Sequence, residues 1–503
     1  MSNRRMSGAL AAFYVAAIFL TGCIPEDSLQ WSDDGSVGLL RVEGALYLVD
    51  GKTGELTEVA KPNVGILPDI SKDGNWIAYS EKVDCDSLSE GLKLLPPGHV
   101  KMIERYAEQM KKKYLDAHAL SRDVKPPFPL PEKGLRLPNN YWNWAVRYLC
   151  ENADNAFLEI LGHEEVEKAK KERIYYFQVV VVPRDNLANK RVVAGVSMFA
   201  LMATQLSPDA KSVAYLMDME ETPVGNEGEY SLYVASLETD MQVMLVDSRV
   251  AVGYDWREDG KAIAYLSADS KEGPPEDATL GTLNEKMVAD ANGSLLAEPA
   301  ELPEHGSAGT HRCTGETAEL VGVVFSPWLK VQYGLDNRIF FSSYAMPLPV
   351  SKRDDPGFSL FCYDPLIATV TDVLPLSVSS HTSEQAFNIS QFALSPDGKN
   401  VLLPIKHNRF IDYELGTNST EIPIPQEEGF GEDGLPELAP SWKGNEAICF
   451  LVSEDSHFLP KAKEGQDKPD RKEIVVLRRT NGQTWVLSEN WPDELASSLK
   501  GDD

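Results

Sequence analysis

The stretch Ser395-Pro396-Asp397-Gly398-Lys399-Asn400-Val401-Leu402-Leu403 combines a tight turn with the beginning of an apolar run. Proline presets φ at the second position of a turn, aspartate tolerates the left-handed backbone region, and glycine enters that region freely. A short apolar run bounded by turn residues is typical of a buried strand. The stretch therefore predicts a β-hairpin turn in which Gly398 takes positive φ.

The same turn recurs along the chain. Related copies are Ser32-Asp33-Asp34-Gly35, Ser71-Lys72-Asp73-Gly74, Ser207-Pro208-Asp209-Ala210, Arg257-Glu258-Asp259-Gly260 and Ser441-Trp442-Lys443-Gly444. The first two copies end 39 residues apart, the third and fourth 50, and Gly398 and Gly444 46. These steps match the length of one four-stranded propeller blade, about 40 to 50 residues.

Two gaps between copies are longer, 136 and 138 residues. The second gap contains a degenerate copy around Phe325-Ser326-Pro327, and the first contains an insertion. Four strands in each of seven units predict an all-β fold, a seven-bladed β-propeller over residues 23–503. Six or eight blades, and a β-sandwich with coincidental turns, are the alternatives.

The turn and its following strand resemble a known repeat. Ser-Pro-Asp-Gly-Lys, then Val/Ile-Ala-Tyr and Leu-Tyr-Val, is similar to the TolB-type, WD40-like propeller repeat of bacterial envelope proteins, and the cleanest copy runs from Leu394 to Leu403. The resemblance covers nearly the whole chain after residue 23 apart from insertions. It implies architecture and a bias toward binding, because propellers host receptors, scaffolds and enzymes alike.

A helical insertion is predicted within the second blade, at residues 86–172. Apolar residues recur there at helical spacing: Val100, Ile103, Tyr106, Met110, Tyr114, Trp142, Ala145, Val146 and Leu149. Lys111, Lys112 and Lys113 stand on the first helix against the acidic trend of the chain. They predict either a solvated face or a contact with a partner or lipid headgroups.

The N-terminus has the order of a secretory signal. Arg4 and Arg5 precede an apolar run of about a dozen residues, which is shorter than the about 20 that span a bilayer. Leu20-Thr21-Gly22-Cys23 resembles the lipobox of bacterial lipoproteins. The resemblance implies that residues 1–22 are a lipoprotein signal peptide and that Cys23 becomes a diacylated N-terminus. Two acyl chains anchor a protein stably in a membrane.

The net charge and the positions of the cysteines give two further expectations, one about partners and one about a disulfide. The net charge of −29 argues against nucleic acid, whose phosphates would be repelled. Cys85 and Cys150 bracket most of the insertion, and a disulfide between them would restrain it in an oxidising compartment.

Signatures of catalysis are few, and we assign no catalytic residue, metal or cofactor. A fused serine peptidase would need a further domain with a Gly-x-Ser-x-Gly elbow, for which the residues after Trp491 leave no room. The spacing of His305, His311 and Cys313 fits no standard zinc pattern. A glycosidase needs only two carboxylates, which 77 acidic residues do not exclude.

The expanded loops indicate a working face. The loops from Asp84 to Arg173, Glu220 to Glu229, Ala345 to Gly357 and Glu454 to Arg471 all connect second to third strands. Such loops share one face of a propeller, so we expect partners there, with Lys111, Lys112, Lys113, Trp142 and Trp144 as contacts.

The sequence therefore favours a membrane-anchored envelope lipoprotein that acts as a non-enzymatic protein- or ligand-binding scaffold. We expect it at the outer membrane if the cell has two membranes. The alternative is an envelope hydrolase or lyase that acts on carbohydrate or peptide from the propeller centre.

Overall fold

A computed structural model describes part of the chain. The described residues are 27–65, 67–95, 97–119, 139–152, 154, 157–159, 162–171, 174–197, 203–218, 230–238, 242–246, 249–268, 277–283, 316–324, 329–345, 357–374, 392–405, 409–416, 438–452, 473–492 and 495. The predicted signal peptide and Cys23 lie outside these residues, as do His305, His311, Cys313 and most of the expanded loops.

The first three repeats each form a four-stranded antiparallel sheet whose strands follow chain order. The strands of the first are β1 (Ser28–Trp31), β2 (Val37–Val42), β3 (Ala45–Asp50) and β4 (Leu56–Ala60). Those of the second are β5 (Asp69–Ile70), β6 (Trp76–Cys85), β7 (Ile174–Pro183) and β8 (Arg191–Ser197). Those of the third are β9 (Thr204–Leu206), β10 (Ser212–Asp218), β11 (Tyr230–Ser236) and β12 (Gln242–Val246).

The middle of the chain forms one nine-stranded sheet. Its strands are β13 (Arg249–Val250), β14 (Asp255–Trp256), β15 (Ile263–Ala268), β16 (Asp277–Leu283), β17 (Glu316–Val324), β18 (Val331–Tyr333), β19 (Ile339–Ala345), β20 (Gly357–Asp364) and β21 (Thr369–Asp372). Two residue pairs between β17 and β19 join the strands of two sequence repeats into this sheet.

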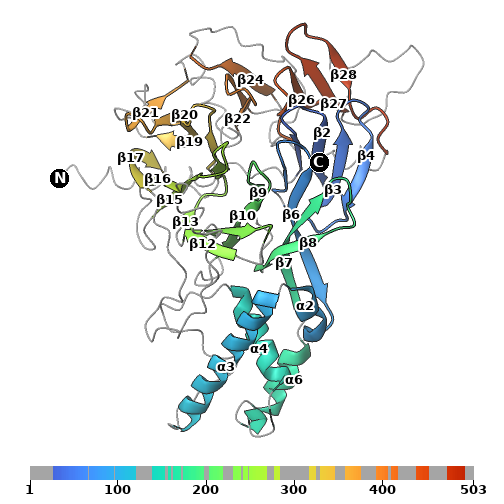
Figure 1. Cartoon of the computed structure of the whole chain (residues 1–503), viewed down its shortest axis with the longest axis vertical. Helices are drawn as coiled ribbons and strands as arrows, with labels where there is room; N and C mark the ends of the chain where they lie inside the picture. Colours follow the sequence, from blue (N-terminus) through green and yellow to red (C-terminus); the bar gives the residue numbers. More distant parts are fainter. Residues whose placement is uncertain are drawn as a thin grey trace, which may run out of the picture.

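Two further sheets complete the described strands. One has β22 (Ala393–Leu394), β23 (Asn400–Ile405) and β24 (Arg409–Glu414); the other has β25 (Ser441–Lys443), β26 (Ala447–Val452), β27 (Glu473–Arg478) and β28 (Thr484–Val486). The sheets lie around a closed circuit, a β-propeller (Figure 1). Six hydrogen-bonded sheets among the described residues do not by themselves establish the seven blades expected from the sequence.

The predicted turns are present, and their polar residues explain their shape. Gly398 has φ +65°, which confirms the prediction. The Ser395 hydroxyl donates to Asp397 Oδ1 at 2.7 Å, and the Gly398 amide donates to the Ser395 carbonyl at 2.8 Å. Ser32, Ser71 and Ser207 bond to the aspartate two residues later in the same way. Each turn therefore closes on its own side chains and fixes the hairpin that follows.

Apolar clusters fill the spaces between consecutive repeats, and one of them closes the circuit. Leu29 and Leu40 of the first sheet pack with Leu451 and Trp491 of the last. The Trp491 indole donates to the Gly54 carbonyl at 2.8 Å. A Cβ at Gly54 would lie 2.2 Å from the Leu487 carbonyl oxygen, so the close approach of residue 54 to Leu487 requires glycine. The first and last sheets are separate, and the ring is closed between them by these side chains together with a parallel backbone bridge between Asp27 and Leu438.

Helices of the described residues lie between β6 and β7 and extend to one side of the ring (Figure 1). They are α2 (Leu88–Leu94), α3 (Pro97–Ala119), α4 (Asn139–Glu151) and α6 (His163–Lys171). Their apolar stripes pack on one another: α3 and α4 share a cluster that includes Ala107, Met110, Ala145 and Leu149. Among the described residues, no helix combines the length and apolar character that crossing a membrane requires.

The predicted disulfide is not formed. Cys85 and Cys150 are buried thiols that are not bridged to each other. Cys85 packs in a cluster with Leu88 and Trp144, whereas Cys150 belongs to a different cluster with Phe157. The helices hold the insertion together by apolar packing, so its ends need no covalent link.

Candidate functional site

A central cavity of about 430 Å³ lies where the first strands of the repeats converge. Residues of seven short strands line it: β1, β5, β9, β14, β18, β22 and β25. The volume falls in the range typical of pockets for small ligands. The cavity is the candidate functional site.

Strand pairing identifies one equivalent cavity-lining position in every repeat. At this position each residue pairs with the second strand of its repeat, one residue before the end of the first strand in six repeats and two residues before it in the last. The seven residues are Gln30, Asp69, Gln205, Asp255, Gln332, Ala393 and Ser441. Five of the seven carry an amide or a carboxylate. The wall of the cavity is therefore polar at this level.

These polar side chains tie the first six repeats to one another in order. Gln30 Nε2 donates to the Pro68 carbonyl at 3.1 Å, and the Leu206 amide donates to Asp69 Oδ2 at 2.7 Å. Gln205 Nε2 donates to Asp255 Oδ1 at 2.7 Å. Further along, the Tyr333 amide donates to Asp255 Oδ2 at 2.7 Å, and the Leu394 amide to Gln332 Oε1 at 3.0 Å. The bonds hold the cavity wall in a fixed geometry.

The two carboxylates of the wall are shifted toward their neutral forms. Burial raises the pKa of Asp69 to about 7, against the hydrogen bond from the Leu206 amide that lowers it. Burial likewise raises the pKa of Asp255 to about 6, against the bonds from Tyr333 and Gln205. Desolvation disfavours the charged form of a carboxyl group, and here it outweighs the donors.

Two lysines also line the cavity. Lys330 Nζ donates to the Phe392 carbonyl at 2.7 Å and lies 5.5 Å from the centre of the Phe392 ring. Burial lowers the pKa of Lys330 to about 8, although Asp255 raises it. Lys72 Nζ lies 3.7 Å from Glu258 Oε2 at the rim. Both ammonium groups are thus already engaged within the protein.

Several polar atoms of the cavity residues have no partner. Gln205 Oε1, Ser28 Oγ and Ser441 Oγ are buried and make no hydrogen bond in the structure. Buried polar groups without partners cost free energy, which a bound ligand or water recovers. Among the described residues, no three His, Cys, Asp or Glu side chains gather closely enough to hold a metal ion. The arrangement is suited to a polar organic ligand.

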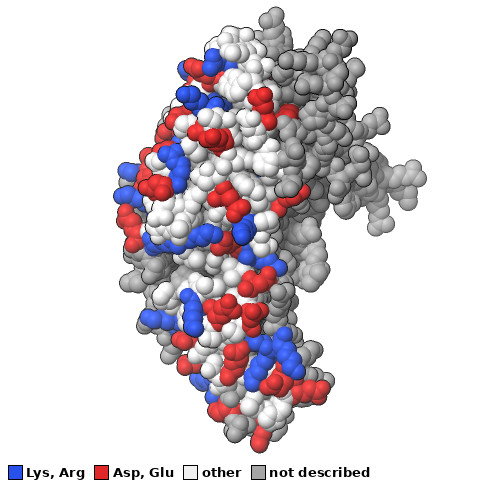
Figure 2. Space-filling model, turned by 90° about the vertical axis from the view of Figure 1, so that its right-hand side faces the viewer, with Lys and Arg blue, Asp and Glu red and all other residues white. Residues whose placement is uncertain are grey.

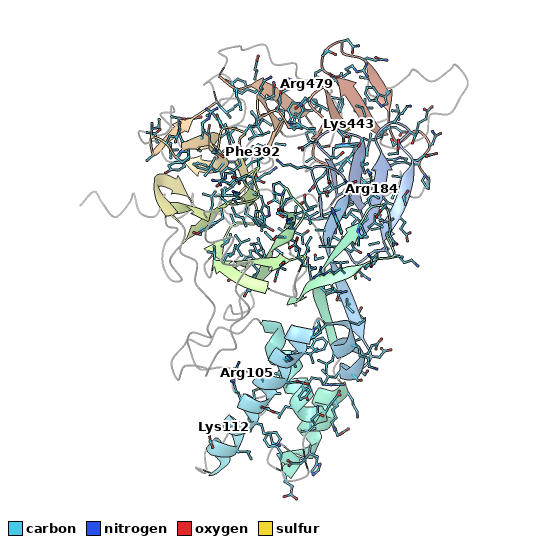
Figure 3. All side chains as sticks on the ribbon, viewed as in Figure 1. Arg105, Lys112, Arg184, Phe392, Lys443 and Arg479 are labelled. Atoms are coloured by element: carbon cyan, nitrogen blue, oxygen red, sulfur yellow. The ribbon has the colours of Figure 1, made fainter. Side chains whose placement is uncertain are left out.

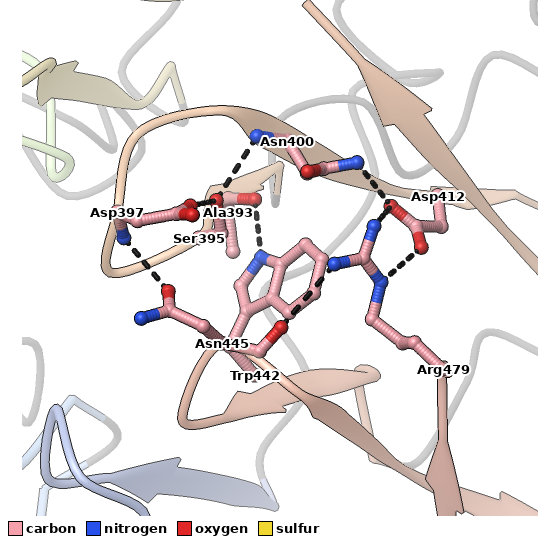
Figure 4. A network of polar contacts seen from close by, with 8 residues as sticks. All are labelled: Ala393, Ser395, Asp397, Asn400, Asp412, Trp442, Asn445 and Arg479. Atoms are coloured by element: carbon pink, nitrogen blue, oxygen red, sulfur yellow. Dashed lines mark hydrogen bonds and ion pairs between the residues drawn. The ribbon is translucent and has the colours of Figure 1, made fainter. Parts of the chain in front are cut away.

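A polar network holds the cavity wall between the last two sheets (Figure 4). Arg479 forms two bonds to Asp412, 2.5 and 3.1 Å long, and its guanidinium lies 5.1 Å from the centre of the Trp442 ring. The Trp442 indole donates to the Ala393 carbonyl at 2.8 Å. The Asp397 amide donates to Asn445 Oδ1 at 2.8 Å. The network positions Trp442, which lines the cavity.

The contact residues predicted from the sequence lie away from this cavity, in the helical insertion. Lys111 pairs with Asp154 at 3.1 Å and lies over the Phe157 ring, so it belongs to the internal packing of the insertion. Trp144 is 3% exposed among apolar side chains, and its prediction as a surface contact is wrong. Lys112 is exposed. The side chains of Lys113 and Trp142 lie outside the described part of the chain.

Figure 3 shows Lys112 and Arg105 on the helices, far from the ring residues Phe392, Lys443 and Arg479. The face seen in Figure 2 carries basic and acidic side chains side by side, with no large area of one sign. A mixed charge pattern favours a solvated surface or a specific partner over general attraction to anionic lipid.

The residues of the cavity wall were not predicted from the sequence. Gln30, Asp69, Gln205 and Asp255 each stand two positions before the first residue of a recognised turn. Alignment of the repeats on that turn shows this polar column. The cavity wall could have been predicted from this polar column, because inward positions of adjacent blades must share one channel.

Comparisons with known proteins return only distant likenesses. No family model matches the chain, and no curated protein does. Among solved structures, an oligogalacturonate lyase from Vibrio parahaemolyticus is 12% identical with a TM-score of 0.37, over 74% of this chain and 72% of that one. A putative TolB from Agrobacterium tumefaciens is 13% identical with a TM-score of 0.33, over 69% and 79%.

The β-propeller domain of the Trilobed protease from Pyrococcus furiosus is 14% identical with a TM-score of 0.35, over 63% of this chain and 76% of that one. These likenesses are distant, and none of them bears on what the cavity binds. The assignment of the chain as a β-propeller rests on its own sheets and their closed circuit.

Proposed function

We propose that this protein is a lipid-anchored envelope protein whose propeller binds a polar ligand in its central cavity and serves as a non-enzymatic binding scaffold. The observation that carries the proposal is the polar cavity wall, in which side chains of successive repeats are fixed by bonds to their neighbours. A rigid wall lowers the entropy cost of binding.

We further propose that the propeller has seven blades. Among the described residues, seven first strands line the cavity, and seven apolar clusters each join two consecutive repeats around the circuit. The nine-stranded sheet then corresponds to two blades, β14 to β17 with the short β13 beside β15, and β18 to β21, joined by the short pairing of β17 with β19.

The cavity proposal is tested by blocking the cavity. Ser441→Trp adds an indole to the wall, and Leu366→Trp, at a site 91% exposed, is the matched control. Native mass spectrometry of protein purified from its own envelope should find bound ligand mass with the wild type and the control, and none with Ser441→Trp. Wild-type protein that never carries a ligand, even after incubation with envelope extract, contradicts the proposal.

The anchor is proposed at Cys23, with sorting to the outer membrane where the cell has two membranes. Its support is the lipobox-like Leu20-Thr21-Gly22-Cys23 after an apolar run too short to span a bilayer. Cys23→Ala should abolish labelling by a radioactive fatty acid and release the protein from the membrane fraction or leave it uncleaved. Cys362→Ala, at a buried strand residue, is the control. Unchanged labelling of the Cys23 variant would refute the anchor.

We also propose that a partner protein, and not nucleic acid, meets the face that carries the helices. Lys112 is exposed there on α3, and the insertion forms its own apolar clusters. Deleting residues 86–172 should leave a folded ring but remove cross-links to an envelope partner. A deletion variant that keeps every cross-link would disprove this part.

The second candidate function is that of an envelope hydrolase or lyase acting on carbohydrate or peptide. Asp69 and Asp255 favour it, since their pKa values of about 7 and 6 suit general acid and base catalysis near neutral pH. An enzyme would lose turnover in Asp69→Asn and Asp255→Asn while the ligand still bound. Lost binding without any turnover in the wild type would favour the scaffold.

A further inference from the structure

Three neighbouring repeats place oxygen acceptors side by side in the cavity wall. Gln205 stands between the repeats of Asp69 and Asp255, and its Nε2 donates to Asp255 Oδ1 at 2.7 Å. This bond leaves Gln205 Oε1, which is buried and has no hydrogen-bond partner. A carbonyl oxygen can accept only from a donor, so the vacant position calls for an N–H or O–H group.

Among the described residues, Asp69 and Asp255 form no direct ion pair within 4 Å, although Lys72 acts on both carboxylates and the buried Lys330 acts on Asp255 from a greater distance. Lys330 is bonded to the Phe392 carbonyl at 2.7 Å, and Lys72 pairs with Glu258 at 3.7 Å. The equivalent positions of the other repeats carry amides, a hydroxyl and an alanine. A buried carboxylate without a paired cation is costly, and a bound cation would remove that cost.

We infer that the cavity binds an organic cation through a protonated primary amine, seated among Asp69, Gln205 Oε1 and Asp255. The inference rests on the proposed ligand-binding function. An ammonium group has three donors, and the wall offers three neighbouring acceptors. A bound metal ion is disfavoured because Ca²⁺ takes six to eight oxygen ligands, and the described residues provide no cluster of three acidic or other ligating side chains.

An ammonium group is attracted strongly only to an ionised carboxylate, so we expect binding to depend on pH. Burial raises the pKa of Asp69 to about 7. The charged and titratable groups that face Asp69 are Lys72, Asp255 and Tyr254. Those that face Asp255 are Asp69, Lys72, Lys330 and Tyr333. At pH 8 Asp69 is ionised and attracts the ammonium group. At pH 5.5 Asp69 is protonated, and this attraction is lost.

The test uses the full chain in detergent and isothermal titration with 1,4-diaminobutane, with the uncharged 1,4-butanediol as the isosteric probe. We expect the diamine to bind at pH 8 and the diol not to bind. The affinity for the diamine should fall at least tenfold at pH 5.5 and at least tenfold in Asp69→Asn at pH 8. Asp185→Asn removes the same charge from an exposed turn and should leave the affinity unchanged.

Equal binding of the diol, or an unchanged affinity in Asp69→Asn, would overturn the amine site. Circular dichroism and thermal melting of Asp69→Asn confirm that the variant is folded. If the ligand that co-purifies with the wild type lacks an amine and the diamine does not bind, the amine inference fails while the ligand-binding function stands. If no ligand co-purifies and no amine binds, both fail.

Discussion

Asp69 and Asp73 belong to one hairpin, four residues apart, and their surroundings act on them in opposite directions. Asp69 lines the central cavity, where burial raises its pKa to about 7. Asp73 lies in the turn, where burial also raises the pKa, but hydrogen bonds from Ser71 and Asn75 outweigh it and the net shift is downward. Folding therefore disfavours the ionised form of Asp69 and favours the ionised form of Asp73.

The same contrast separates a second cavity aspartate from a second turn aspartate. The pKa of Asp255 in the cavity is raised by burial, whereas that of Asp34 in a turn is lowered, first by the Ser36 amide and then by Ser32. Turn aspartates stabilise the hairpins that build the fold. Cavity aspartates cost stability, and groups that cost stability concentrate at functional sites.

The largest expected effect comes from removing the charge in the cavity. Asp69→Asn should raise the free energy of unfolding at pH 8 by on the order of 2 kcal/mol or more, because asparagine keeps an oxygen for the Leu206 amide without a buried charge. The folded pKa of Asp69 lies above its usual value of 3.8, so its contribution to stability is present below that value and is lost as the pH rises through about 7.

Urea denaturation between pH 4 and pH 8 measures this effect. The gain in the variant should grow with pH and vanish near pH 4. A variant less stable than the wild type at pH 8 would show that Asp69 supports the ring as an anion, and the contrast with Asp73 would disappear.

The next effect tests the turn. Gly398 has φ +65°, and a Cβ there would lie 3.3 Å from the Leu335 side chain. Gly398→Val should cost about 1–2 kcal/mol, since a side chain in the left-handed region is strained. Gly482→Val should cost a similar amount, because Gly482 has φ +67° with nothing within 4 Å of its Cβ and so shares the backbone strain without the contact to Leu335. Equal melting temperatures of wild type and Gly398→Val would mean that the turn relaxes.

A smaller effect of opposite pH dependence is expected at Asp73. Asp73→Ala removes bonds from the Ser71 hydroxyl at 2.6 Å and the Asn75 amide at 3.0 Å, and should cost about 1 kcal/mol at pH 7. The folded pKa of Asp73 is lowered, so its contribution is present above the usual 3.8 and is lost as the pH falls through the folded pKa. Acid denaturation curves of the two proteins should therefore converge at low pH; curves that stay parallel would refute this.

The fold could be predicted from the sequence because its turns are local. Ser395 to Gly398 specifies its own hydrogen bonds within four residues, so one copy identifies the others and their spacing identifies the blade. The pairing of β17 with β19 could not be predicted, since it depends on the distance between two repeats and on no local pattern.

The candidate site was harder to predict for the same reason. The pKa of Asp69 depends on burial by other repeats, and the bond from Gln205 to Asp255 joins residues 50 positions apart. The helical stripe containing Trp144 was correctly expected to be apolar, but Trp144 itself was also taken for a contact; its burial against the neighbouring helices contradicts that. A stripe indicates which residues pack, and residues that pack are not available to a partner.

The smallest effect separates backbone strain from side-chain bonding in the turns. Ala210 occupies the place that glycine holds in the other turns, and it has φ 53°. Ala210→Gly relieves about 1–2 kcal/mol of left-handed strain but gives the unfolded chain more freedom, worth about 0.4–1 kcal/mol. The expected result is a net gain of about 0.5–1 kcal/mol in urea denaturation. Ala368→Gly, at φ 49° in the β20–β21 turn, should gain a similar amount without any Ser and Asp pair nearby. A loss of stability in both variants would show that the alanines are relaxed, and the turns would then owe their shape to the Ser and Asp bonds alone.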